Sequence, residues 1–129
     1  MNNNPVGWFE IYVQDIDRAQ KFYETVLGIS MANVLPPSEE GEGLKMVAFA
    51  MGDETMAQTG SSGALCQMEG YPSGGNSTIV YFISEDCGVE EGRVEGAGGK
   101  VFRPKMSIGQ YGFVSLCTDP DGNMFGLHS

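Results

Sequence analysis

The sequence predicts an α+β fold made of two βαβββ modules. Two observations lead to it: a strand is followed by an amphipathic helix near the start of the chain, and the same pattern returns about 70 residues later. Short apolar segments divided by turn-rich loops then follow each helix. Because 129 residues is the size of one domain, we expect a single domain over residues 1–129, with modules at 6–69 and 77–129.

The first module opens with a strand from Val6 to Val13, which is rich in aromatic and branched residues. Asp15 or Asp17 can cap the helix that follows, and Gly28 can end it with a positive φ. The apolar side chains at helical spacing are Ile16, Ala19, Phe22, Tyr23, Val26 and Leu27. This stripe predicts a helix that packs on a sheet. The next apolar segments, at 29–35, 44–51 and 63–68, predict an antiparallel meander.

The second module begins with the segment STIVYFISEDCGVEEGRVEGAGGKV, which predicts a strand, an acidic cap, a helix and a Gly-Gly turn. We align its residues 83–85 with residues 13–15 of the first module. Glycines at every fourth position make this helix intrinsically weak, so tertiary contacts must hold it. Further strands are expected at 100–103, 111–117 and 124–129.

Composition limits the partners and the compartment. A net charge of −10 opposes binding to nucleic acid and to anionic membranes, and no apolar run approaches the ~20 residues that cross a bilayer. The N-terminus lacks the basic and apolar pattern of a secretory signal, so we expect a cytoplasmic location. Cys66, Cys87 and Cys117 are widely spaced and predict buried, reduced thiols rather than disulfides or a zinc site.

Several stretches of the sequence together resemble one family. They are FEIYVQDIDRAQKFYETVLG near the start, MEGYPSGG and GGKVFRPKMSIGQYGF further on, and DPDGNMFGLHS at the end. With the paired modules, they resemble the vicinal oxygen chelate superfamily of glyoxalase, bleomycin-resistance and extradiol-dioxygenase proteins. The resemblance implies the glyoxalase/bleomycin resistance fold, with cupped mixed sheets and helices on the outside. Many chemistries share this scaffold, so function must be argued from the site.

The resemblance also implies where metal-using members place four ligands. The positions on the first strand of each module fall on Trp8 and Thr78, and the position on the last strand of the chain falls on Gly126. On the last strand of the first module, Gln67 is the best candidate and offers only a neutral oxygen. Because zinc and similar metals usually need three His, Cys or carboxylate ligands, we expect no metal and no other cofactor.

Side chains alternate between the faces of a strand, which predicts the lining of the cup. The residues expected to face inward are Trp8, Glu10, Tyr12, Thr78, Val80, Phe82, Met124, Gly126 and His128. A loop containing Lys105, Ser107 and Tyr111 can cover the cup. Apolar walls with few polar groups suit a small organic molecule. The predicted ligand-binding residues are Trp8, Tyr12, Gln67, Thr78, Phe82, Lys105, Tyr111 and Met124.

Glu10 and His128 are the candidate base and acid. A carboxylate that faces an apolar concavity needs a partner, and such groups gather at functional sites, although a structural ion pair or hydrogen bond explains Glu10 equally well. His128 lies near the chain end, where a solvent-facing or hydrogen-bonded role is the structural alternative. The aromatic residues can likewise simply fill the core.

The leading hypothesis is a metal-free protein that binds a small, aromatic or cationic molecule in the cup and forms a homodimer. One alternative is a glyoxalase-like lyase or isomerase, or a dioxygenase, with a metal held by Glu10, His128 and Gln67. Another is a protein-interaction or immunity module that uses the sheet edges.

Overall fold

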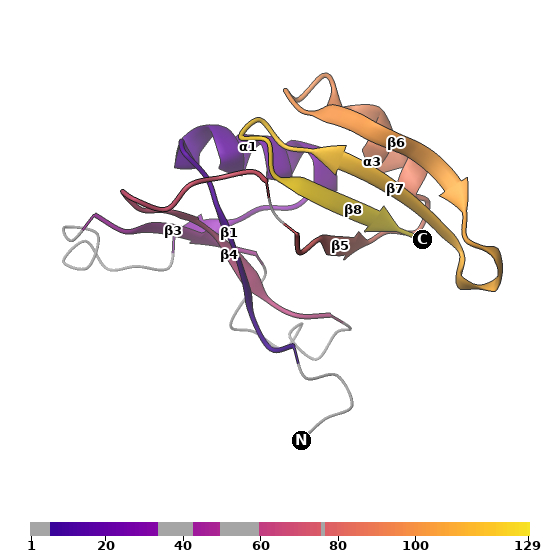
Figure 1. The fold of residues 1–129 in the computed structure, drawn as a ribbon, viewed down its shortest axis with the longest axis horizontal. Helices are drawn as coiled ribbons and strands as arrows, with labels where there is room; N and C mark the ends of the chain where they lie inside the picture. The colour runs from indigo at the N-terminus through magenta and orange to yellow at the C-terminus, as the bar shows by residue number, and fades with distance from the viewer. Residues whose placement is uncertain (1–5, 34–42, 50–59, 76) are drawn as a thin grey trace.

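The computed structural model describes residues 6–33, 43–49, 60–75 and 77–129. They form two four-stranded mixed sheets and two α-helices, which confirms the predicted α+β class (Figure 1). The helix α1, Ile16–Leu27, lies above the region where the two sheets meet. Neither described helix is long and apolar enough to span a membrane.

The first sheet has the order β1-β4-β3-β2. Its strands are β1 Phe9–Tyr12, β4 Gly63–Gln67, β3 Lys45–Ala48 and β2 Ala32–Asn33. β1 and β4 are parallel, and the other pairs are antiparallel, as the predicted meander requires. Parts of the predicted segments 29–35 and 44–51 lie outside the described residues.

The second sheet repeats this arrangement with the order β5-β8-β7-β6. Its strands are β5 Val80–Ile83, β8 Met124–His128, β7 Phe113–Thr118 and β6 Lys100–Ser107. Strand β6 runs four residues beyond the predicted end at Arg103, so Lys105 lies on a strand and not in a covering loop. Tyr111 belongs to a short 3-10 helix, η2 Gly109–Tyr111, that joins β6 to β7.

The helix caps show how the two modules correspond. In α1 the Asp15 side chain accepts a hydrogen bond from the Arg18 amide, and Gly28 ends the helix at φ 69°. In α3, Cys87–Val94, the cap is Asp86, which accepts from the Gly88 amide. Asp15 and Asp86 are 71 residues apart, so the alignment of residue 85 with Asp15 is one residue out.

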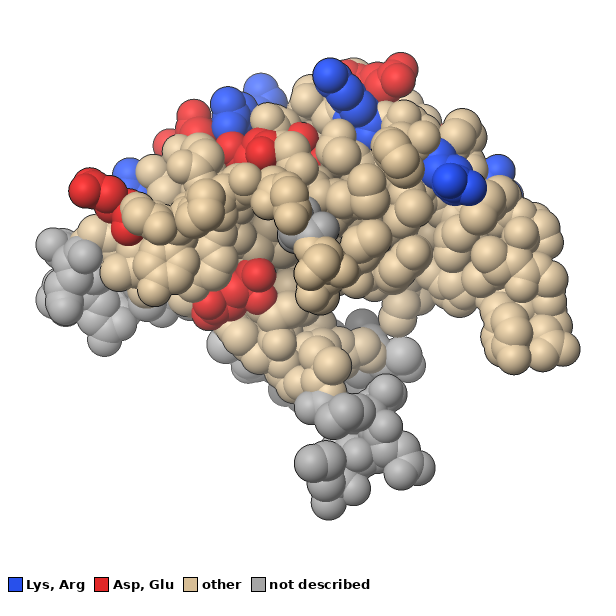
Figure 2. All heavy atoms as spheres, in the orientation of Figure 1, with Lys and Arg blue, Asp and Glu red and all other residues tan. Residues whose placement is uncertain are grey.

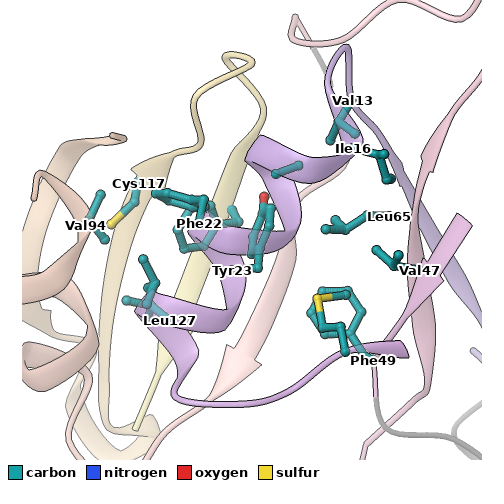
Figure 3. Packing of buried hydrophobic residues seen from close by; sticks show 14 of the residues in the cluster. Val13, Ile16, Phe22, Tyr23, Val47, Phe49, Leu65, Val94, Cys117 and Leu127 are labelled. Atoms are coloured by element: carbon teal, nitrogen blue, oxygen red, sulfur yellow. The ribbon is translucent and has the colours of Figure 1, made fainter. Parts of the chain in front are cut away.

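The core lies between the helices and the sheets. Phe22 and Tyr23 of α1 point toward the interior, with Leu127 and Cys117 on the second-module side and Leu65 on the first (Figure 3). Aromatic rings meet edge to face, as between Phe22 and Phe125, whose centroids are 5.9 Å apart. Cys66, Cys87 and Cys117 are buried free thiols, as the sequence predicted.

A polar network joins the two modules at the DPDGN turn. The carboxylate of Asp119 accepts hydrogen bonds from Tyr23 Oη at 2.8 Å and from the Asn123 amide at 2.9 Å. The Asn123 side chain in turn donates to the Tyr12 carbonyl at 2.9 Å. Burial raises the pKa of Asp119 despite these hydrogen bonds, and it raises the pKa of Tyr23. The turn therefore fixes the end of β1 against the last hairpin.

Candidate functional site

The face of each sheet that points away from the helices is called the open face below. On β1 the side chains of Phe9 and Ile11 pack against the core, so alternation places Trp8, Glu10 and Tyr12 on the open face, as predicted. Figure 2 shows charged side chains mainly along the margin where α1, α3 and β6 lie, while the hollowed lower side is mostly uncharged.

The Glu10 carboxylate has two partners on its own strand. Trp8 Nε1 donates to one carboxylate oxygen at 3.1 Å, and Tyr12 Oη donates to the other at 2.7 Å. Glu10 is exposed, so the predicted carboxylate in an apolar concavity is instead a solvated group that orients two aromatic rings. The Tyr12 ring also stacks on Tyr71, with centroids 4.9 Å apart.

Glu10 influences two neighbouring acidic groups. Its hydrogen bond to Tyr12, together with burial and its negative charge, raises the pKa of the Tyr12 phenol. Cys66, the register partner of Tyr12 on β4, shares the open face. Burial and then the charge of Glu10 raise the pKa of the Cys66 thiol to about 12. Both groups therefore stay protonated near neutral pH.

The open face of the second sheet carries different residues from those predicted. Tyr81 and Ile83 lie on this face and are 46% and 67% exposed. Phe82 points to the core, where its ring lies 6.0 Å from that of Tyr23 and 5.9 Å from that of Phe125. The physical reason is the one-residue misalignment of the helix caps, since a shift of one residue exchanges the two faces of a strand.

A cavity of about 700 Å³ lies between the two sheets. Both modules contribute to its wall: Trp8 and Phe49 come from the first, and Thr78, Tyr81 and Phe82 from the second. Phe82 belongs to the core and also forms part of the cavity wall. Trp8 and Thr78 line the cavity, so a ligand bound there would contact them. Among the described residues, the polar groups around the cavity are serines, Thr78, the indole N–H and the carboxylate of Glu90. We call this the inter-sheet cavity.

A second cavity of about 620 Å³ lies on the open face of the second sheet alone. Its lining residues are Tyr81, Ile83, Arg103, Met106, Ile108, Val114, Leu116 and His128. His128 shares this face as predicted, and its Nε2 lies 2.7 Å from the Tyr111 carbonyl oxygen. Because a carbonyl only accepts, Nε2 carries the proton. We call this the second-sheet cavity; the two cavities share Tyr81 and Ile83.

The structure does not bring all the predicted site residues together. Gln67 faces α1, where its Oε1 accepts the Ile16 amide hydrogen bond at 2.8 Å. Lys105 lies against α3, pairs with Asp86 at 2.8 Å and sits over the Phe113 ring. Neither lines a cavity described above, so their predicted places in the cup are corrected.

The remaining predicted residues lie apart from one another. Tyr111 is exposed and meets the second-sheet cavity only through its hydrogen bond to His128. Met124 is half-buried at the start of β8. Glu10 and His128 stand on different sheets, and no hydrogen bond between them is present in the described part of the chain.

No cluster of three or more His, Cys, Asp or Glu side chains that could hold a metal ion occurs among the described residues. The strand register also revises the positions implied by the resemblance. With the 71-residue offset, the counterpart of Trp8 is Ile79, and the first-module counterpart of Gly126 is Ala64. None of these four side chains is a metal ligand.

Sequence reasoning missed several lining residues, among them Tyr81, Ile83, Glu90 and Arg103. Tyr81 and Ile83 would have been found by aligning Asp86, rather than residue 85, with Asp15. Arg103 had no signal of its own, because register shifts interrupt the pairing of β6 with β7 on both sides of it and break the simple alternation.

Comparisons with known proteins agree with this architecture. Residues 6–39 match the family model described as "Bleomycin resistance protein-like N-terminal". No curated protein is significantly similar in sequence to the chain. The fold is similar to that of glyoxalase I from Zea mays, with a TM-score of 0.72 and 22% identity over 94% of this chain and 43% of that one. This chain thus spans less than half of the maize chain.

Solved structures of similar length show the same fold. A glyoxylase/bleomycin resistance protein/dioxygenase domain from Frankia sp. matches with a TM-score of 0.69 and 15% identity, over 98% of both chains. A glyoxalase-related enzyme from Fulvimarina pelagi matches with a TM-score of 0.68 and 17% identity, over 97% of this chain and 87% of that one. The chain therefore has the glyoxalase/bleomycin resistance fold, which confirms at the level of the fold what the resemblance in its sequence implied.

Proposed function

We propose that the protein binds a small, mainly apolar organic molecule in the inter-sheet cavity without the help of a metal ion. The observation that carries this proposal is the cavity itself, about 700 Å³ in volume and lined by aromatic and aliphatic side chains of both modules. Small-molecule sites typically occupy roughly 300–1,000 Å³ and combine apolar walls with a few polar groups.

The polar groups at the cavity favour a neutral or cationic ligand. Glu90 is the charged residue in the described part of the lining, and its carboxylate accepts a hydrogen bond from the Ser84 hydroxyl. Trp8 presents a ring for stacking or for a cation–π contact. Its indole N–H is held by Glu10, so Glu10 acts as a positioning residue for the cavity wall rather than as a base that touches the ligand.

The residues at the four implied ligand positions support a metal-free site. Trp8, Ile79, Ala64 and Gly126 offer no oxygen, imidazole or thiolate donor. The alternative metal set of Glu10, His128 and Gln67 is divided among two sheets and the helix-facing side of β4. One equivalent of zinc, nickel, iron or manganese that survives dialysis and is lost in Glu10→Ala would support the metal-dependent enzyme instead.

The neutral probe N-phenyl-1-naphthylamine tests the cavity directly. Its emission rises in an apolar site, and Trp8 is the single tryptophan of the chain, so energy transfer from Trp8 reports binding beside it. Read from the emission of the directly excited probe, Trp8→Ala should weaken binding about tenfold, because an aromatic contact that the ligand buries contributes roughly 1.5 kcal/mol. Phe102→Ala removes an exposed ring outside the lining and should leave the affinity unchanged. Equal affinities in the two variants would refute the proposed site.

The homodimer also remains a proposal. In the order of the described strands, β1 and β2 are the outer strands of the first sheet, and β5 and β6 are those of the second. The edges of such strands commonly pair with another chain, and two-fold symmetry is the commonest arrangement. Light scattering should give twice the chain mass of 13.9 kDa, and a mass of one chain at every concentration would contradict the proposal.

A further inference from the structure

We propose that the second-sheet cavity is a separate site that binds a hydrophobic monocarboxylate, with the carboxylate on Arg103 and the apolar part on the sheet. This site lies beside the inter-sheet cavity and differs from it in the sign of its charge. The argument rests on the walls of the cavity, on the state of Arg103 and on the state of His128.

The walls are apolar. Ile83 on β5 and Met106 on β6 lie on either side of Val114 and Leu116 on β7 in the order of the strands, and Tyr81 adds an aromatic ring. Val114 is a register partner of both His128 and Met106, so these side chains share one face of the sheet. With about 620 Å³ the cavity has room for a chain of several carbons or for an aromatic ring. The apolar part of the ligand is assigned to this surface.

Among the residues that the structure describes around this cavity, Arg103 carries a full charge and none is acidic. The chain has three arginines, and the other two bind acceptors of the protein itself. Arg18 pairs with Asp121, and Arg93 donates to the Val26 carbonyl at 3.1 Å. Among the described residues, no ion pair or hydrogen bond engages the Arg103 guanidinium. In a chain of net charge −10, this cation is left open to an external anion.

The guanidinium geometry points to a carboxylate. Its fork of N–H donors matches the two carboxylate oxygens, and apolar surroundings strengthen such a pair. His128 does not compete for this role. Its Nε2 is already hydrogen-bonded to the Tyr111 carbonyl oxygen at 2.7 Å, so this nitrogen is not available to a ligand. Of the described residues that line the inter-sheet cavity, Glu90 carries the charge, and it repels an anion.

Octanoate, octan-1-ol and octylamine test this inference, because they share one tail and differ in charge. By calorimetry we expect the wild type to bind octanoate about fivefold more tightly than octan-1-ol, and octylamine more weakly than either. Arg103→Gln should remove the preference for octanoate, and Arg103→Glu should reverse it. Lys100→Gln removes an exposed cation from the same strand, outside the cavity, and should change the octanoate affinity less than twofold.

Methyl NMR of Met106, Ile108 and Leu116 places the ligand. Octanoate should shift these methyl signals, and circular dichroism should show that the Arg103 variants stay folded, since Arg103 is exposed. The inference is overturned if octanoate does not bind or if octanoate and octan-1-ol bind equally. It is also overturned if Lys100→Gln weakens octanoate binding as much as Arg103→Gln does, or if octanoate shifts the methyl signals of Val6, which lines the inter-sheet cavity, instead. Energy transfer from Trp8 to N-phenyl-1-naphthylamine reports the inter-sheet cavity independently, so failure of one site is distinguishable from failure of the other.

Discussion

The ring of Tyr81 covers Gly126 on the open face of the second sheet. The two residues are register partners on β5 and β8, and a Cβ atom on Gly126 would lie 2.3 Å from Cδ2 of Tyr81. The position where the resemblance implies a metal ligand is therefore closed by an aromatic ring. Glycine is required here because of this close approach, and its φ angle is not positive.

Gly126→Ala should lower the free energy of unfolding by about 1–3 kcal/mol, because the new methyl group must push the Tyr81 ring aside. Tyr81→Ala should remove most of this cost in the double variant. Gly92→Ala is the matched control, since its Cβ would meet nothing within 4 Å and a helix favours alanine. Urea denaturation of the wild type, the three single variants and the double variant measures these costs, and a Gly126→Ala cost that persists without the Tyr81 ring would refute the contact.

Glu10→Gln should lower the pKa of Tyr12 toward its ordinary value of 10.0, since the hydrogen bond and the charge of Glu10 are main causes of the upward shift. Absorbance titration at alkaline pH should show that one tyrosine ionises at a lower pH in the variant than in the wild type. Glu69→Gln removes an exposed carboxylate of the same type and should leave the titration curve unchanged. Identical curves for wild type and Glu10→Gln would contradict the contact between Glu10 and Tyr12.

Asp119→Asn should destabilise the protein, because the Asn123 side-chain amide and Tyr23 lose a carboxylate acceptor. The cost should shrink as the pH rises. The pKa of Asp119 in the folded protein lies above its usual value of 3.8. As the pH rises, the carboxyl therefore ionises more readily in the unfolded state than in the folded state, and the wild type loses stability. The asparagine variant does not ionise, so the difference between the two proteins becomes smaller. Denaturant unfolding at about pH 3 and about pH 7 measures the difference. A cost that grows with pH would contradict the raised pKa.

The native thiols should react slowly with Ellman's reagent at mildly alkaline pH. Cys66, Cys87 and Cys117 are fully buried, and the pKa of Cys66 is raised to about 12, so the reactive thiolate is scarce. In denaturant all three thiols should react at once. A fast stoichiometric reaction of the folded protein would show that one thiol is accessible, and mass spectrometry would identify it.

The sequence was sufficient for the fold because both modules carry the same local signals, a strand, an acidic cap and an apolar helical stripe. It was insufficient for the faces of the second sheet. Residues 85 and 86 are both acidic, and only the hydrogen bond from the Gly88 amide identifies Asp86 as the cap. Because strands have a period of two residues, this single ambiguity led to the prediction that Val80 and Phe82 face the cup, where the structure has Tyr81 and Ile83.

Long-range pairing was equally hidden in the sequence. The Gln67 side chain accepts a hydrogen bond from the Ile16 amide at the start of α1. Lys105 donates to the carboxylate of Asp86, which lies 19 residues earlier in the chain. Both contacts depend on tertiary geometry that local patterns do not encode. On β1 the side chains alternate regularly between the two faces. The predicted placement of Trp8, Glu10 and Tyr12 on one face was therefore confirmed.

The most direct test of metal-free binding in the inter-sheet cavity is a titration of chelator-dialysed protein with N-phenyl-1-naphthylamine, followed by energy transfer from Trp8. We predict saturable binding of one probe per chain, with the same affinity before and after dialysis and after addition of zinc or nickel. Absence of saturable transfer would contradict the cavity as a binding site. Transfer that is lost on dialysis and restored by a metal ion would contradict the metal-free account.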